Sequence, residues 1–198
     1  MEHKIRQYRL EPGALEVEYM EELFTEFVDR KKTASEIIQR LEGREHLILL
    51  SMAASPEDES LEIPVAFKVG HELKAHETDS QLSDLAIQLR DTVQFDGRKI
   101  FYCWIGGTRA EWRGQGHYRA LTEQQEEWAH QNGYDEMVVK TKNKYYFMRA
   151  TLDRMRFDVI KFEPTGADRG QAKMYLSKQL GVDTLRHHLT SRSVVEAA

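Results

Sequence analysis

A glycine-bearing, charged run joins a strand-like segment to a helix-like segment near the middle of the chain. The run spans residues 111–118 and reads EWRGQGHY; apolar residues 100–105 precede it, and a helical pattern that reaches Ala129 follows it. The first N–H groups of a helix lack intrahelical partners and lie at the positive end of the helix dipole. A strand-to-helix turn of this kind predicts a binding site for a phosphate or pyrophosphate group.

Length and composition indicate one compact domain with a sizeable core. The chain has 198 residues, of which 40% are apolar and 31% are charged, as in ordinary globular proteins. No apolar run approaches the length of a membrane span, and the N-terminal residues are too charged for a secretory signal. The single cysteine, Cys103, excludes an intramolecular disulfide and is expected to be a small buried residue. A cytoplasmic location is therefore expected.

Charge and histidine spacing bear on the partners of the chain. The net charge of −5 argues against nucleic acid as a partner, because binding DNA usually requires an excess of Lys and Arg on one face. No membrane partner is expected either. His71 and His76 are five residues apart, so they would not share a helix face as zinc-protease ligands do. We expect no metal site. The acidic residues Glu123, Glu126 and Glu127 are expected on an exposed helix face.

Alternating and helical patterns predict strands interleaved with helices, which is typical of a single α/β sheet with helices on its faces. The predicted elements are a strand at 3–9, a helical region at 15–41 with a second helix capped by Thr33 and ended at Gly43, a hairpin at 46–52 and 61–69, a polar segment at 71–98 with a helix at 82–92, a strand at 100–108, a helix at 116–131, a strand at 137–140, a helix at 144–155, and strands at 157–162 and 172–176. We predict one domain over 1–180, with 71–98 as a variable insertion, and a tail at 181–198.

Two familiar phosphate-binding loops do not fit the turn. A Walker A loop requires GxxxxGK[ST], and the sequence contains no such match. A dinucleotide-binding loop requires GxGxxG after the first strand of its fold. Here Arg119 stands at the place of the third glycine, and the turn follows roughly the fourth predicted strand. Both alternatives are rejected.

The turn resembles the cofactor loop of the GNAT superfamily of N-acetyltransferases. Arg113-x-x-Gly116 after a strand is similar to that family's Gln/Arg-x-x-Gly-x-Gly/Ala loop, which Glu and an aromatic residue commonly precede, as Glu111 and Trp112 do here. Residues 142–145 (KNKY) then lead into a helix that ends at Arg156-Phe157, where the family often has Gly-Phe. The resemblance covers residues 3–176 in element order and is specific for 100–162.

The resemblance implies both a fold and a reaction. The fold would be of the α/β (α+β three-layer) class, with a single mixed, mostly antiparallel sheet splayed open beside strand 100–108. Acetyl-CoA would bind there as co-substrate, and an uncharged primary amine of a small molecule or protein would attack its thioester directly in a ternary complex. Backbone donors near Gly107 and Thr108 would polarise the thioester carbonyl. The implied cofactor-binding residues are Gly107, Thr108, Arg113, Gly114, Gln115, Gly116, His117, Tyr118 and Asn143.

Several positions depart from the family pattern. Tyr118 stands where the family usually has Gly or Ala, so its side chain must point away from the pyrophosphate or narrow the cleft. Leu152 stands where many members carry the tyrosine that protonates the departing thiolate. Tyr145 lies two turns earlier on the same predicted helix face and is the candidate general acid. Tyr102 occupies a strand position where some members place a glutamate base, and it is the second catalytic candidate.

The departures leave other function classes open. A non-catalytic acyl-CoA-binding regulatory module is the main alternative to an enzyme, and a cofactor-free interaction domain is a third. We expect residues 15–41 and 71–98 to form the acceptor wall, where such folds vary most. The acidic net charge favours cationic amines as acceptors. The sequence also allows a homodimer.

Overall fold

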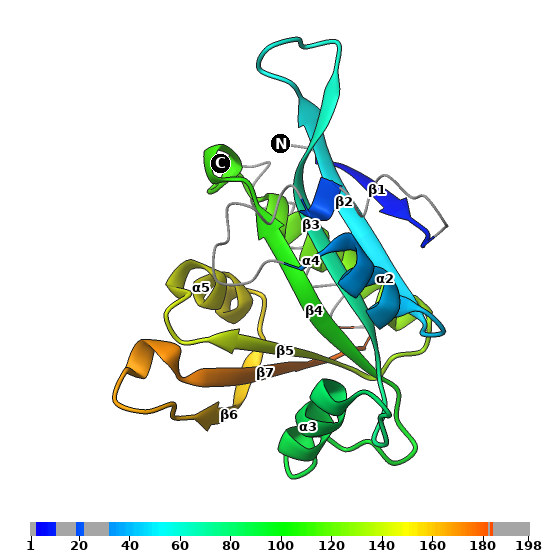
Figure 1. Cartoon of the computed structure of the whole chain (residues 1–198), viewed down its shortest axis with the longest axis vertical. Helices are drawn as coiled ribbons and strands as arrows, with labels where there is room; N and C mark the ends of the chain where they lie inside the picture. The colour runs from blue at the N-terminus through cyan, green and yellow to red at the C-terminus, as the bar shows by residue number, and fades with distance from the viewer. Residues whose placement is uncertain (1–2, 11–18, 22–31, 182, 184–198) are drawn as a thin grey trace. The chain divides into compact units, whose positions relative to one another are not determined.

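The computed structural model describes residues 3–10, 19–21, 32–181 and 183 of the chain, and its strands form one sheet (Figure 1). The sheet has seven strands in the order β1-β2-β3-β4-β5-β7-β6. Its strands are β1 (Lys4–Tyr8), β2 (His46–Ala54), β3 (Glu62–Leu73), β4 (Ile100–Thr108), β5 (Glu136–Lys142), β6 (Asp158–Glu163) and β7 (Lys173–Gln179). The described helices include α2 (Ala34–Leu41), α3 (Ser80–Leu89), α4 (His117–Gln131) and α5 (Tyr146–Arg154). The predicted interleaving of strands and helices is confirmed.

By its internal contacts the chain divides into two compact units. The first comprises Met1–His71 and Trp104–Gln125, and the second comprises Glu72–Cys103 and Glu126–Ala198. The predicted tail at 181–198 lies outside the described residues apart from 181 and 183, and so does most of the predicted helix that precedes α2. β3 continues to Leu73, so the first residues of the predicted insertion belong to a strand.

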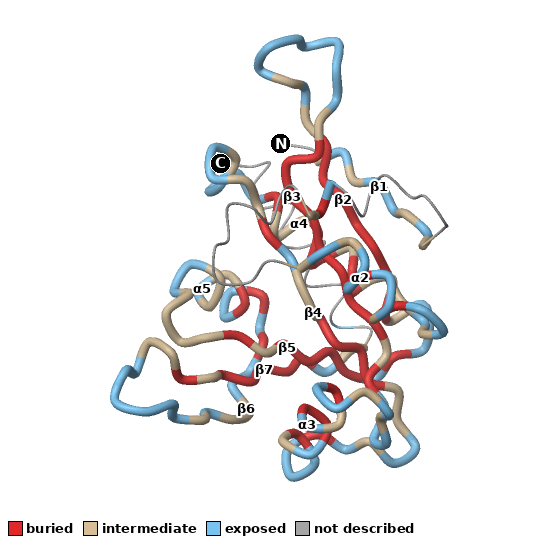
Figure 2. The backbone as a smooth tube through the Cα atoms, viewed as in Figure 1, coloured by how far each residue is buried: buried red, intermediate tan, exposed pale blue. Residues whose placement is uncertain are grey.

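The core of the first unit lies between α2 and the β2–β3 hairpin. β2 and β3 pair antiparallel from His46–His71 to Ala54–Glu62, which confirms the predicted hairpin. Buried Ile37 and Leu41 of α2 pack in the same cluster as Ile48 and Leu50 of β2. Figure 2 shows β2 and β3 as mostly buried, while the tip of the hairpin is exposed. Burial of apolar side chains in such a cluster is the main favourable contribution to the stability of a folded domain.

α2 begins where its capping residues predict. The Thr33 hydroxyl accepts a hydrogen bond from the Glu36 N–H at 3.2 Å, and the Glu36 carboxylate accepts one from the Thr33 N–H at 2.9 Å. This reciprocal pair is a capping box, and it satisfies two of the N–H groups that a helix start leaves unpaired. After the helix, Gly43 has a φ of +70°, a conformation that glycine adopts without steric cost. The predicted limits of this helix are confirmed.

The pairing of neighbouring strands is parallel between β4 and β5. β4 and β5 pair in parallel from Ile100–Glu136 to Cys103–Val139, whereas the β1–β2, β2–β3, β5–β7 and β6–β7 pairs are antiparallel. The parallel register ends at Cys103, although β4 continues to Thr108 and β5 to Lys142. A mixed, mostly antiparallel sheet that is splayed beside β4 is therefore confirmed.

In the second unit, helices cover opposite faces of β5. The Thr141 hydroxyl lies 3.5 Å from the sulfur of Met148 in α5. Its neighbour Lys140, which alternation places on the other face, lines a pocket together with α3.

Cys103 is buried as expected, with 6% of its surface exposed.

The carboxylates of α4 correct an expectation from the sequence. Glu123 and Glu126 are 6% and 0% exposed, not on a solvated face. Arg119 donates to Glu123 at 2.8 Å, and the buried Lys178 of β7 donates to Glu126 at 2.6 Å. A buried carboxylate is tolerated when a hydrogen-bonded cation accompanies it. Lys178 is 52 residues from Glu126, so the helix sequence alone gives no sign of this partner.

Arg156 occupies a backbone conformation that favours glycine. α5 ends with a Schellman motif, in which the Arg156 N–H donates to Asp153 O at 2.9 Å and the Phe157 N–H donates to Leu152 O at 3.0 Å. The motif requires a left-handed conformation at the first residue after the C-cap of the helix. That residue is Arg156, and its φ is +63°. The GNAT pattern often has a glycine at this position, which would adopt the conformation without the strain that Arg156 carries.

We predict that Arg156→Gly stabilises the protein by about 0.5–1 kcal/mol. Relief of the left-handed strain, about 1–2 kcal/mol, exceeds the extra entropy that glycine gains in the unfolded chain, about 0.5–1 kcal/mol. Urea denaturation checks the difference. Arg156→Ala is the control because it removes the same side chain and keeps the strain, and an equal gain in both variants would contradict the backbone explanation.

Candidate active site

The turn between β4 and α4 exposes its backbone through two left-handed glycines. β4 ends at Thr108, a short 3-10 helix follows at Ala110–Trp112, and Gly114 and Gly116 then adopt φ values of +80° and +88°. α4 begins directly afterwards, at His117. Residues 113–116 are exposed. The turn is thus exposed immediately before a helix start, whose first N–H groups lack intrahelical partners, as an anion-binding site requires.

Side chains of the turn fold back onto its own backbone. The Arg113 Nε donates to the carbonyl of Thr108 at 3.2 Å, and the Gln115 amide donates to the carbonyl of Glu111 at 3.2 Å. The Arg109 N–H donates to Val65 O at 3.0 Å and ties the end of β4 to β3. These bonds fix the path of the loop without occupying the glycine backbone.

Imidazoles lie beneath the turn. His117 is 4% exposed, its Nδ1 lies 2.9 Å from Ser51 Oγ, and its ring centroid is 4.5 Å from that of His3 and 5.8 Å from that of Trp112. A Cβ on Gly116 would lie 3.2 Å from His3 Nε2. Burial lowers the pKa of His117, and the adjacent His3 lowers it further. The His117 Nε2 has no hydrogen-bond partner among the described residues, which suits a neutral ring.

The bulky Tyr118 is packed against the sheet of its own unit. The ammonium of buried Lys68 lies 4.6 Å from the centre of the Tyr118 ring and donates to Thr122. A Cβ on Gly106 would lie 3.5 Å from the Tyr118 ring. That distance is an ordinary van der Waals contact, whereas the same Cβ would lie only 3.1 Å from the Phe67 carbonyl oxygen, so it is the neighbouring strand that restricts position 106. The cation–π contact stabilises the position of the Tyr118 ring. Tyr118, the second residue of α4, is half-buried.

In the second unit, Asn143 holds the junction between β5 and α5. Its N–H donates to Ala172 O at 2.8 Å and its side-chain amide donates to Arg169 O at 3.0 Å. Its side-chain oxygen accepts a hydrogen bond from Arg149 of α5. Both ends of this carboxamide are thus engaged in local structure, and cofactor binding by Asn143 stays a prediction.

The tyrosine candidates differ in their surroundings. Tyr145 is the residue that precedes α5 and is partly exposed, with the Lys144 ammonium 5.5 Å from its ring centre. Tyr102 lies within β4 and is 7% exposed. Leu152, at the family's tyrosine position, is fully buried. Of the residues proposed for proton transfer, Tyr145 is the more accessible.

Solved structures share this architecture. No protein-family model matches the sequence, and no curated protein sequence matches it significantly. The structure of Arabidopsis thaliana NAA60 in complex with acetyl-CoA is similar with a TM-score of 0.67 at 13% identity, over 89% of this chain and 99% of that one. A putative acetyltransferase of the GNAT family from Desulfovibrio desulfuricans is similar with a TM-score of 0.62 at 11% identity, over 91% and 100%. The chain has the GNAT fold.

A further GNAT-fold neighbour was solved with ligands. The NatC complex bound to Gag peptide and CoA is similar with a TM-score of 0.65 at 12% identity, over 90% of this chain and 99% of that one. The shared fold is the one that the resemblance of residues 100–162 predicts, although few residues are identical.

The described part of the chain bears on the expectations about membranes and metals. No helix there is both long and apolar enough to cross a bilayer. The same residues contain no group of three or more His, Cys, Asp or Glu side chains arranged to hold a metal ion. His71 lies in β3, and His76 lies beyond the end of that strand.

Sequence reasoning missed the side chains that support the turn from a distance. Ser51 and Lys68 are buried polar residues of β2 and β3 that contact the start of α4. The visible signal was weak: Lys68 interrupts an otherwise apolar run from Val65 to Val69. A charged residue inside a buried strand indicates a partner, but the sequence does not identify it.

We predict that acid destabilises the protein through the imidazoles beneath the turn. Because the pKa of His117 is lowered from 6.5, the unfolded chain binds more protons than the folded chain below that pH, and the free energy of unfolding falls as the pH falls from there. His3, whose pKa burial also lowers, adds to the effect. Urea denaturation between about pH 7 and about pH 5 measures it.

The matched variant for this pH profile is His117→Gln, which keeps a polar group near Ser51 and does not titrate. It should make the profile less steep in the stated range, and the slope that remains is the contribution of His3. Glu62 and Glu163, whose pKa values hydrogen bonds from lysines lower from 4.5, lose their stabilisation at more acidic pH and do not confuse the comparison. A variant profile as steep as that of the unaltered protein would contradict the assignment.

Proposed function

We propose that the chain is an acetyl-CoA-dependent N-acetyltransferase that moves the acetyl group directly to a primary amine. The observation that carries this proposal is the exposed turn with left-handed Gly114 and Gly116 at the start of α4. It occurs in a fold that is shared with a structure holding acetyl-CoA. A turn of N–H groups at a helix start suits the pyrophosphate of this co-substrate.

The backbone of the turn would hold the cofactor. The N–H groups of residues 114–118 would bind the pyrophosphate, while the side chains of His117 and Tyr118 are packed elsewhere in the unit. Arg113 braces the loop through Thr108 and presents its positive charge at the exposed turn. Acetyl-CoA supplies the activated acyl group.

Amides at the end of β4 would assist the transfer. N–H groups near Gly107 and Thr108 would donate to the thioester carbonyl oxygen and stabilise the negative charge that develops on it. This stabilisation needs no titratable residue, so it is compatible with a leucine at position 152, where many members of the family have a tyrosine.

Proton transfer is the second requirement. An alkyl amine has a pKa of about 10, so a proton must leave it before attack, and the departing thiolate must gain one. We assign Tyr145 as the proton donor and Tyr102 as a residue beside the path of the amine proton, which water would carry. Asn143 would place Tyr145 through the hydrogen bonds at the β5–α5 junction.

The first test concerns the pyrophosphate grip. We predict that Gly116→Ala weakens acetyl-CoA binding by about tenfold or more, because the new Cβ would lie 3.2 Å from His3 Nε2 and would strain a φ of +88°, which displaces the amides. Calorimetric titration or a thermal-shift series measures the affinity. Gly133→Ala is the matched control because its φ is +76° and nothing lies within 4 Å of the added atom. Full affinity in the Gly116 variant would refute the placement.

The second test concerns chemistry. We predict that Tyr145→Phe lowers kcat by about 10²-fold, a usual effect of losing a general acid, and leaves the KM for acetyl-CoA unchanged. Release of free thiol with a panel of amines reports turnover. Tyr146→Phe, the adjacent tyrosine with 66% exposure, is the control. Cofactor binding without turnover on any amine would instead indicate a non-catalytic acyl-CoA-binding module.

A further inference from the structure

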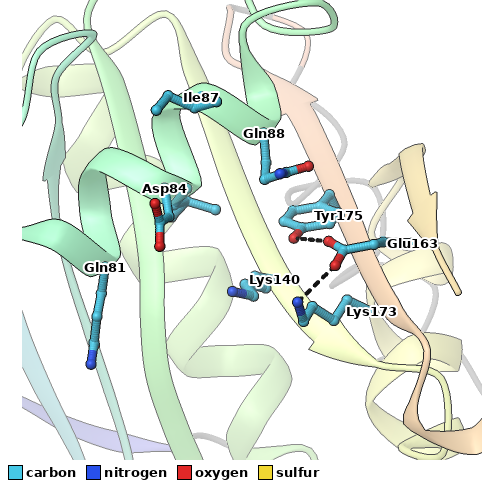
Figure 3. Close-up of a pocket in the computed structure, with 9 residues that line it drawn as sticks. Gln81, Asp84, Ile87, Gln88, Lys140, Glu163, Lys173 and Tyr175 are labelled. Carbon is cyan, nitrogen blue, oxygen red and sulfur yellow. Dashed lines mark hydrogen bonds and ion pairs between the residues drawn. The ribbon is translucent and has the colours of Figure 1, made fainter. Parts of the chain in front are cut away.

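A pocket lies between α3 and the strands of the second unit (Figure 3). Its volume is about 450 Å³, within the range of small-molecule sites. One wall is α3, and the other is formed by β5, β6 and β7. α3 belongs to the segment 71–98, which the sequence suggests as part of an acceptor wall.

The helix wall is held in place over the strands. Lys161 of β6 donates to the backbone carbonyl of Gln88 at 2.9 Å and to its side-chain oxygen at 2.7 Å. Leu85 of α3 is 4% exposed and packs as part of the core. These contacts give the pocket a fixed roof, so its two walls present their charges at a defined separation.

The strand wall carries excess positive charge. The Glu163 carboxylate accepts hydrogen bonds from Lys173 Nζ at 2.7 Å and from the Tyr175 hydroxyl at 2.8 Å. These donors hold the pKa of Glu163 below its ordinary value, and burial raises the pKa of Tyr175, so Glu163 is ionised and Tyr175 neutral. Lys173 balances Glu163, and Lys140 adds a further positive charge 5.9 Å from the Tyr175 ring centre.

The helix wall carries the opposite charge beside apolar surface. Asp84 projects from α3 toward the space above Lys140 (Figure 3). The Asp84 side chain is exposed and forms no ion pair or side-chain hydrogen bond within the described part of the chain. Ile87, 47% exposed, lies on the same wall. A ligand here meets a carboxylate and an apolar side chain on one side and ammonium groups on the other.

We propose that this pocket binds a small zwitterion with an apolar side chain, that is, a primary amine that also carries a carboxylate. The ligand carboxylate would accept hydrogen bonds from Lys140 and Lys173, and its ammonium group would pair with Asp84. Its apolar part would contact Ile87 and the face of Tyr175. That such a ligand is also the acetyl acceptor rests on the proposed function, whereas its binding does not.

L-Phenylalanine and L-leucine are suitable probes, because each combines the two charges with an apolar side chain. Binding to the full chain is followed by amide chemical shifts in α3 and β7. Phenylalaninamide lacks the carboxylate and 3-phenylpropionate lacks the ammonium group. We expect saturable shifts with both amino acids, and about tenfold weaker binding of each truncated analogue than of phenylalanine.

Two variants separate recognition from folding. Asp84→Asn should weaken the binding of phenylalanine and of phenylalaninamide by about tenfold and leave the binding of 3-phenylpropionate unchanged. Lys140→Gln should weaken the binding of phenylalanine and of 3-phenylpropionate and leave the binding of phenylalaninamide unchanged. A general disturbance of the pocket would not produce this crossed pattern. Asp91→Asn, an exposed carboxylate just after α3 that does not line the pocket, is the control and should bind like the unaltered protein.

Failure of this proposal is distinguishable from failure of the proposed function. Absence of saturable shifts with both amino acids, or phenylalanine affinity that neither variant changes, would overturn the pocket assignment even if other amines are acetylated. Saturable, crossed binding without acetylation of phenylalanine would support the pocket and exclude the amino acid as the acceptor, whereas lack of acetyl transfer to every amine tested would count against the proposed function alone. Acetylation of phenylalanine that Asp84→Asn weakens through KM would support both.

Discussion

The turn between β4 and α4 must expose its backbone amides while the first residue of the helix is buried. Left-handed Gly114 and Gly116 allow the first condition, because a side chain at either position would strain the backbone, and at Gly116 it would also meet His3. The second is met by His117, which enters a space bounded by Ser51, His3 and Trp112. The cofactor site that we propose depends on both, since the amides are useful only while the helix start stays fixed.

Buried polar side chains hold α4 on both of its halves. Near its start, Lys68 contacts Thr122 and the Tyr118 ring, and near its middle, Lys178 pairs with Glu126. Removing either member of the Lys178–Glu126 ion pair leaves an uncompensated buried charge, which is strongly destabilising. Within the first unit, Lys68 therefore fixes residues 118–122 on β3, and within the second, Lys178 fixes Glu126 on β7. A bulky residue at 118 is compatible with this arrangement because its ring packs on the Lys68 ammonium.

The fold and the acceptor are separate questions in this molecule. The GNAT fold is shared with proteins of 11–13% identity, and one fold can serve many acceptors because the variable segments carry the specificity. Here α3 and the strands of the second unit enclose a charged pocket whose walls have opposite signs. That pocket is a property of this chain's own segment 71–98 and of its lysines, and the proposed substrate class follows from them.

The sequence by itself determined the elements, because the periodicity of strands and helices, the Thr33 cap and the glycine turn are local patterns. It predicted β4 at its observed limits and the family resemblance of residues 100–162, from which the splayed sheet followed. It was wrong about Glu123 and Glu126, and it gave no sign of the pairing of Lys140, Glu163, Lys173 and Tyr175 around one pocket. Tertiary structure alone decided these, because a charge is buried or exposed according to partners that lie far away in sequence, such as Lys178 for Glu126. The local pattern of apolar and polar residues determines whether a segment forms a helix or a strand. The electrostatic environment of a side chain depends instead on which strands the fold brings beside it.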